Sequence, residues 1–182
     1  GQAFLQYFLT GKKDYSNLPQ FQKYFQEDNM IFYSPIGANK DTIPRRSLYQ
    51  NSGYEFNYWV NIDEKSHPPL SGIMAAFSNY IFFQKLGLIN DVDSHNLYSV
   101  FVASILVAII FFWVGKKYGL FAGLIATLSL VLYPLFFAEL HFNIKDVPEA
   151  VFYSLTLITF YEAIINRSIK WLLLSSVLFG LA

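Results

Sequence analysis

The chain of 182 residues contains no cysteine, which excludes disulfide bonds, thiolate metal sites and a cysteine nucleophile. Charged residues are also scarce: they make up 14% of the chain, whereas soluble domains usually carry about a quarter. The 13 basic and 13 acidic residues balance, so we expect no nucleic acid partner. The motifs GxSxG, HExxH, GxxxxGK[ST] and GxGxxG are absent, which removes several common enzyme classes.

Apolar residues dominate instead. Hydrophobic residues make up 54% of the chain and aromatic residues 19%, a composition typical of lipid-facing helices and interfacial belts. Apolar runs long enough to cross a bilayer occupy about residues 97–115, 119–138 and 148–165, and another begins at 171. We therefore expect an all-α fold, a polytopic membrane helical bundle that is integral to the membrane, crosses it several times and contacts membrane lipid.

Residues 1–96 are predicted to form a large extracytoplasmic loop with juxtamembrane helices, and residues 97–182 the transmembrane helices. Within the loop, residues 18–28 show amphipathic spacing, which suits a helix on the bilayer or an ordinary surface helix. Residues 70–88 are apolar but interrupted by Ser, Asn, Gln and Lys, so we expect a juxtamembrane helix. The next segment, INDVDSHN (residues 89–96), is predicted to be a polar connecting loop, with its histidine a part of that connector.

Positive charge predicts the topology. Lys116 and Lys117 lie in one short connection, and Arg167 and Lys170 lie in the next connection but one. The positive-inside rule makes both cytoplasmic, so the connection with Asp146 faces outward. If residues 70–88 crossed the membrane, residues 1–69 would be cytoplasmic, which parity alone allows.

The segment HFNIKDVPEA, residues 141–150, places ionisable groups between two apolar runs, where charge is usually functional. Pro148 suits the first turn of a helix, and a helix N-terminus at Asp146 favours a phosphate group. Lys145 adds a full positive charge, and His141 is placed to donate a hydrogen bond or line an acceptor site. The same residues allow a second interpretation, a capping box in which Asp146 caps the helix and Glu149 reaches back.

A second group of polar residues, DEKSHPP, occupies residues 63–69. Two adjacent prolines favour an extended turn and a rigid helix start. Such a turn holds His67 and the nearby carboxylate of Glu64 at a fixed separation.

The order of these motifs resembles the GT-C membrane glycosyltransferases over roughly residues 60–170. HPPL at 67–70 is followed by a short apolar helix, a polar break, two spans joined by GKKYG and an Asp-bearing outer loop. The likeness is greatest to the protein O-mannosyltransferase and aminoarabinose transferase group. It implies helical spans, a polyprenyl-phosphate-linked sugar as donor, a protein, lipid or glycan as acceptor, and often a divalent cation, Mg²⁺ or Mn²⁺.

The resemblance also implies roles for the candidate residues. Asp146 is expected to be catalytic and a metal ligand, organising the cation or the departing phosphate. Glu64 is expected to be a second metal ligand and His67 a catalytic residue. Lys145 and His141 are expected to bind the substrate.

In that family the catalytic base is an acidic residue just after the first span. Residues 1–10 contain none, so we expect the chain to be a fragment whose base precedes Gly1. The competing hypothesis is a non-enzymatic membrane protein, such as a transporter or an assembly subunit. A transporter is expected to carry polar groups at mid-span, whereas here the span centres hold little beyond Ser and Thr. The polar groups gather at the outer ends, which favours an interfacial enzyme.

Overall fold

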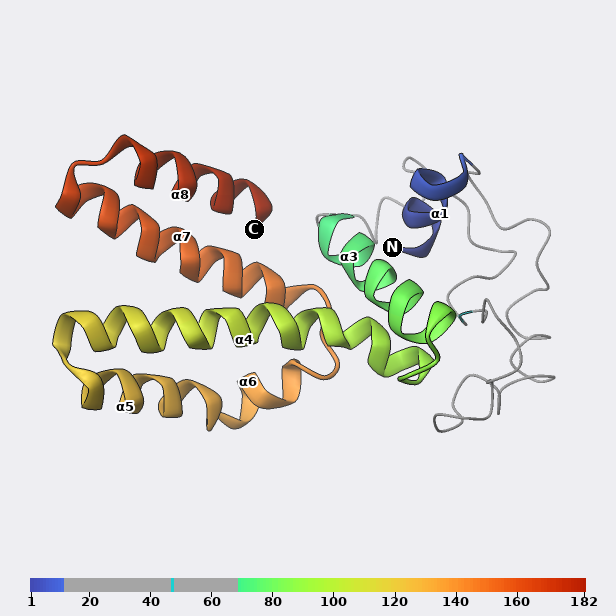
Figure 1. The fold of residues 1–182 in the computed structure, drawn as a ribbon, viewed down its shortest axis with the longest axis horizontal. Helices are drawn as coiled ribbons and strands as arrows, with labels where there is room; N and C mark the ends of the chain where they lie inside the picture. Colours follow the sequence, from blue (N-terminus) through green and yellow to red (C-terminus); the bar gives the residue numbers. More distant parts are fainter. Residues whose placement is uncertain (12–46, 48–68) are drawn as a thin grey trace. The chain divides into compact units, whose positions relative to one another are not determined.

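The computed structural model describes residues 1–11, 47 and 69–182, which form two compact units, Gly1–Tyr98 and Ser99–Ala182. In this part of the chain every regular element is a helix, so the predicted all-α class is confirmed for it. The helix predicted at residues 18–28 lies outside the described residues. The elements are α1 (Gln2–Thr10), α3 (Pro69–Asn79), the π-helix η2 (Tyr80–Lys85), α4 (Asp91–Tyr118), α5 (Leu120–Val131), α6 (Pro134–Glu139), α7 (Asp146–Asn166) and α8 (Ile169–Leu181) (Figure 1).

In the first unit, α1 packs on α3 with their backbones almost in contact. A Cβ atom on Gly1 would lie 1.9 Å from the carbonyl oxygen of Gly72, so only glycine permits this approach. Ala75, Ala76 and Phe83 are buried beside it and form a small apolar core.

The apolar segment 70–88 is helical, as predicted, but it changes from α-helix to π-helix at Tyr80. The polar loop predicted at residues 89–96 is wrong, because α4 begins at Asp91 and takes in most of that segment. Asn90 starts this helix: its Oδ1 accepts a hydrogen bond from the backbone N–H of Asp93 at 2.8 Å. A polar first turn is typical of both a loop and a capped helix, so the sequence pattern alone does not distinguish them.

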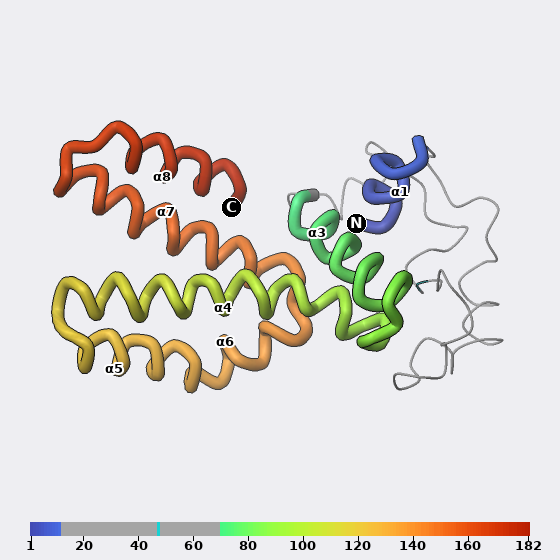
Figure 2. The backbone as a smooth tube through the Cα atoms, viewed as in Figure 1, coloured from blue at the N-terminus to red at the C-terminus, as the bar shows by residue number. Residues whose placement is uncertain are grey.

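In the second unit, α4 lies between α5 and α7, and α8 packs on the other side of α7 (Figures 1 and 2). On the α5 side, Gly123 approaches the α4 backbone near Phe111 and Gly115. On the other side, the Ser175 hydroxyl of α8 donates to the carbonyl of Thr156 in α7 at 3.1 Å. Small residues therefore set the spacing on both sides, as is common where apolar helices pack closely.

The run predicted as one span at residues 119–138 forms two helices and not one continuous helix; its crossing of the membrane stays a prediction. α5 ends at Val131 and α6 begins at Pro134. Proline has no N–H to continue the helix and pushes the preceding residue towards extended backbone. Tyr133 adopts this conformation, with φ −71° and ψ 112°.

One end of α4 is joined to α7 by an ion pair inside a polar and aromatic cluster. The Lys117 ammonium lies 2.6 Å from Oε1 of Glu162, which also accepts a hydrogen bond from the Trp113 indole at 2.7 Å. Asn166 donates to the other oxygen of Glu162 at 2.8 Å. The same ammonium lies 4.3 Å from the centre of the Tyr161 ring, within range of a cation–π interaction. This cluster fixes α4 against α7 at the end that the sequence predicts to be cytoplasmic.

Among the described residues, α4 is the one helix both long and apolar enough to cross a membrane; α5 and α8 are shorter apolar helices. Many large apolar side chains on these helices are exposed, including Phe112, Phe121 and Phe179. The multiple crossings, and the division between an outer part and a transmembrane part at residues 96 and 97, stay predictions.

Replacement of Gly123 by alanine should destabilise the α4–α5 packing. The new Cβ would lie 2.7 Å from the carbonyl oxygen of Phe111 and 3.0 Å from the Gly115 backbone, and backbone atoms yield little. We expect a loss of about 1–3 kcal/mol, seen as a lower melting temperature of the full-length protein in detergent. Gly180→Ala is the control, since its Cβ would meet nothing within 4 Å. An equal or greater melting temperature for Gly123→Ala would contradict this packing.

Candidate active site

The turn before α7 is organised by the side chain of Asn143. Its Oδ1 accepts hydrogen bonds from the backbone N–H of Lys145 at 3.0 Å and of Asp146 at 2.9 Å. Asn143 thus takes the role of a capping residue. The capping box considered for Asp146 and Glu149 is not formed: the N-cap residue is Lys145, and no side-chain capping bond is made there.

Asp146 is the first residue of α7, and its side chain is exposed. The amide nitrogen Nδ2 of Asn143 donates to its Oδ2 at 2.8 Å. Because Asn143 provides the cap, the carboxylate of Asp146 is not needed to bond the backbone N–H groups at the start of the helix. It remains at the helix end as a negatively charged group held by a neighbouring amide.

An open cavity of about 620 Å³ lies beside this carboxylate. Asp146, Glu149 and Tyr153 line it from α7, at the spacing of three and four residues that places side chains on one helix face. Phe179 lines it from α8, and the remaining lining residues are Ala150 and Ala182. This open hollow is therefore largely apolar, with carboxylates and a phenol along one wall.

The first turn of α7 has fewer free backbone N–H groups for an anion than the sequence predicts. The N–H of Asp146, its first residue, already bonds to Asn143, and Pro148 has none. What remains for a phosphate is the partial positive charge of the helix end and the ammonium of Lys145. Recognition of a phosphate here therefore depends on full charges more than on free N–H groups.

The other candidate residues are distributed as follows. Lys145 is exposed next to Asp146 but does not line the cavity, and neither does His141. The imidazole Nδ1 of His141 lies 2.9 Å from the carbonyl oxygen of Phe137, so it donates within its own turn. Glu64 and His67 lie outside the described residues. Within residues 1–11, 47 and 69–182, no group of three or more His, Cys, Asp or Glu side chains could hold a metal.

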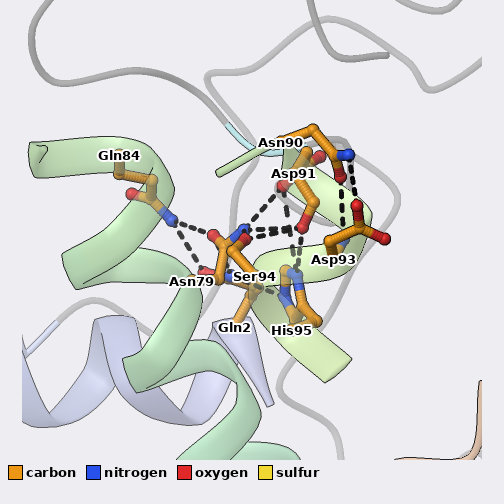
Figure 3. Close-up of polar contacts among 8 residues, drawn as sticks. All are labelled: Gln2, Asn79, Gln84, Asn90, Asp91, Asp93, Ser94 and His95. Carbon is orange, nitrogen blue, oxygen red and sulfur yellow. Dashed lines mark hydrogen bonds and ion pairs between the residues drawn. The ribbon is translucent and has the colours of Figure 1, made fainter. Parts of the chain in front are cut away.

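A buried polar network in the first unit was missed from the sequence (Figure 3). At its centre is Asn79, which is fully buried at the end of α3. Its Nδ2 donates to the carboxylate of Asp91 at 2.7 Å and to the Ser94 hydroxyl at 2.7 Å. Its Oδ1 accepts from the side-chain amides of Gln2 at 3.0 Å and Gln84 at 2.8 Å. One asparagine therefore joins α1, α3, η2 and α4.

His95 belongs to the same network, and its tautomer follows from its partners. Nδ1 lies 3.0 Å from the backbone carbonyl of Asp91, which can only accept, so Nδ1 carries the hydrogen. Nε2 then accepts from the amide of Gln2 at 3.0 Å. His95 is thus a buried structural residue, and its prediction as part of a polar connector is wrong. The signal in the sequence is the helical spacing of Asp91, Ser94 and His95, which places all three on one face.

Over the described residues, these observations define a class: a helical protein with a helix long and apolar enough to span a membrane and a carboxylate-lined cavity at a helix end. This is the class expected of a GT-C glycosyltransferase. The model of the dolichyl-phosphate-mannose-protein mannosyltransferase family matches residues 66–182, more than half of the chain, and the chain belongs to that family. The resemblance to GT-C glycosyltransferases is thereby confirmed. No curated protein and no solved structure matches the chain.

Family membership carries general properties. The family consists of membrane-integral glycosyltransferases that use polyprenyl-phosphate-linked sugars as donors. The matched region includes Asp146, Glu149 and the cavity beside them, and it also includes His67.

Removal of the Asn79 side-chain amide should destabilise the first unit. Asn79→Leu leaves the buried carboxylate of Asp91 and the amides of Gln2 and Gln84 without this partner. We expect a loss of about 3 kcal/mol or more, measured as a lower melting temperature of the full-length protein.

Asn96→Leu is the matched control, because Asn96 is half-buried in α4 and its side chain makes no hydrogen bond among the described residues. Its expected effect is within about 0.5 kcal/mol. Equal melting temperatures for the two variants would show that the network contributes little.

Proposed function

We propose that the chain transfers a sugar from a polyprenyl-phosphate donor to a hydroxyl group of a protein, lipid or glycan at the outer face of the membrane. The match to the mannosyltransferase family over residues 66–182 is the observation that carries this proposal. The same match argues against a transporter or assembly subunit, since this family is one of glycosyltransferases. The position of the cavity at the end of α7 supports it, because a lipid-linked substrate meets a protein where a helix leaves the bilayer.

The reaction has two chemical requirements. The acceptor hydroxyl attacks the anomeric carbon and loses a proton, while the bond from that carbon to the phosphate oxygen breaks. Negative charge develops on the departing polyprenyl phosphate, and nearby positive charge lowers the barrier. In this proposal Lys145 and the N-terminus of α7 face the phosphate, His141 binds the substrate, and His67 assists catalysis.

Asp146 is proposed to organise the phosphate side of the site, together with Glu64 as a second ligand for a divalent cation. The residues present suit Mg²⁺ or Mn²⁺, because both prefer hard oxygen ligands, and Mg²⁺ is often held by one or two carboxylates and substrate phosphates. A bound cation supplies charge stabilisation to the phosphate oxygens. Asp146 and Glu149 are the carboxylates that the described cavity offers.

The protein is further proposed to cross the cell membrane several times, with its catalytic loops extracytoplasmic. α7 is less apolar than α4, but its 21 residues measure about 31 Å along the axis, close to the thickness of the hydrocarbon core. Lys116 and Lys117 at one end of α4 would then be cytoplasmic. Asp146 would face outward, because it lies at the end of α7 opposite to the Lys117–Glu162 pair.

Asp146→Asn in the full-length protein is expected to lower sugar transfer by at least about 100-fold with the melting temperature unchanged. The fold is expected to persist, because Asn143 and not Asp146 provides the cap of α7. Transfer is measured with labelled polyprenyl-phosphate mannose in membranes from cells that express the protein.

Asp93→Asn serves as the control, since Asp93 lies in the first turn of another helix, α4, and pairs with Asn90 in the same way. It is expected to retain full transfer. Full transfer by Asp146→Asn would refute the role of Asp146.

The 182 residues contain no cysteine, so single cysteines placed in them permit a test of topology once any cysteine outside them is replaced. Phe142 and Tyr118 are both exposed aromatic residues at opposite ends of the second unit's helices. In intact cells, a membrane-impermeant maleimide is expected to label Phe142→Cys, whereas Tyr118→Cys becomes reactive only after permeabilisation. The reverse pattern of labelling would place the site on the cytoplasmic face and contradict the proposed topology.

A further inference from the structure

Asn143 uses both ends of its amide at the start of α7, one on the backbone and one on the carboxylate of Asp146. We propose that Asn143 is a positioning residue for Asp146, holding one carboxylate oxygen so that the other is presented to the cavity. This inference deepens the proposed function and rests on it.

The hydrogen bonds determine how the carboxylate is turned. Oδ2 of Asp146 accepts from Asn143 Nδ2 at 2.8 Å. Within the part of the chain that the structure describes, Oδ1 has no hydrogen-bond partner, and Asp146 lines the cavity. An exposed aspartate otherwise exchanges between rotamers, so the bond to Asn143 removes freedom that a ligand would have to remove on binding.

The amide of Asn143 is itself fixed. Its Oδ1 bonds to the N–H groups of Lys145 and Asp146, which prevents the amide from turning over, since Nδ2 in that place would face two donors. Its backbone carbonyl accepts from the Ser99 hydroxyl of α4 at 3.2 Å, and Ser99 is fully buried. The position of the Asp146 carboxylate is therefore fixed relative to α4 as well as to α7.

The chain contains an internal comparison for this arrangement. Asn90 and Asp93 have the same spacing: Asn90 Oδ1 accepts from the Asp93 N–H at 2.8 Å, and its Nδ2 donates to Asp93 Oδ2 at 2.5 Å. Asp93 is not among the residues that line the cavity. The shared geometry starts a helix in both places, and only at Asn143 does it also orient a carboxylate at a cavity.

The test is Asn143→Asp in the full-length protein. The new carboxylate still accepts from the two backbone N–H groups, so the melting temperature should stay within a few degrees of the wild type. Its second oxygen replaces the Nδ2 donor and faces Asp146 Oδ2, so the held orientation is lost. We expect kcat/KM for transfer from polyprenyl-phosphate mannose to fall by about 10–100-fold, as small misplacements of a catalytic group do. Asn90→Asp makes the same change at the other pair and should leave transfer unchanged.

The exchange variant, Asn143→Asp with Asp146→Asn, separates orientation from helix capping. It restores a hydrogen bond between the two side chains with donor and acceptor reversed. We expect a wild-type melting temperature but no recovery of transfer, because the carboxylate is no longer at position 146. Recovery of wild-type transfer would overturn the proposal, since the pair would then serve only to start the helix.

The outcomes separate this inference from the proposed function. Full transfer by Asn143→Asp, with transfer lost in Asp146→Asn, overturns the positioning role and leaves the proposed function standing. Full transfer by Asp146→Asn refutes the role of Asp146 and the positioning role with it. If Asn143→Asp fails to fold, Asn143→Ser replaces it, because serine is also a good capping residue and is too short to hold the carboxylate. A loss of transfer in Asn143→Ser that matches the loss of folded protein counts against the proposal.

Discussion

The structure depends on one constraint: polar groups in a chain this apolar must find partners within the chain itself. Where no water is at hand, an unpaired polar group costs several kcal/mol. Several serines and threonines inside the apolar helices meet this need locally: Ser104, Thr127 and Ser154 each donate to the carbonyl four residues earlier. Many of the larger polar side chains gather at helix ends, around Asn79, Glu162 and Asn143.

This gathering gives α7 a defined position within the second unit. At one end Glu162 binds Lys117 and Trp113 of α4, and at the other the turn at Asn143 is held by Ser99 of the same helix. A helix fixed to one neighbour at both ends can neither slide nor rotate freely against it. The placement of Asp146 is consequently a property of the α4–α7 pair, although its sequence motif is only a few residues long.

Most of the helical architecture could be predicted from the sequence, because long apolar runs have few alternatives to a helix. The break at Pro134 follows from the rule that proline interrupts a helix, although the length of the apolar run favours a single helix. Two features could not be obtained this way. The segment around Asp91 is polar enough for a loop, and only the buried partner Asn79, 12 residues earlier, makes its helical burial favourable. At α7, Asn143 and Asp146 are both good capping residues, and the sequence does not say which of them caps.

That last ambiguity bears on the chemistry. The carboxylate of a capping aspartate accepts hydrogen bonds from the N–H groups of its own helix. Its oxygens would then be less available to a cation. With asparagine as the cap, a neutral group bonds the N–H groups and the carboxylate of Asp146 keeps its charge at the cavity wall. Asp146, Glu149 and a donor phosphate together bring more negative charge than Lys145 alone offsets. If a donor phosphate binds here, as proposed, a divalent cation held by Asp146 would offset this excess of negative charge, and that balance is the physical argument for proposing one.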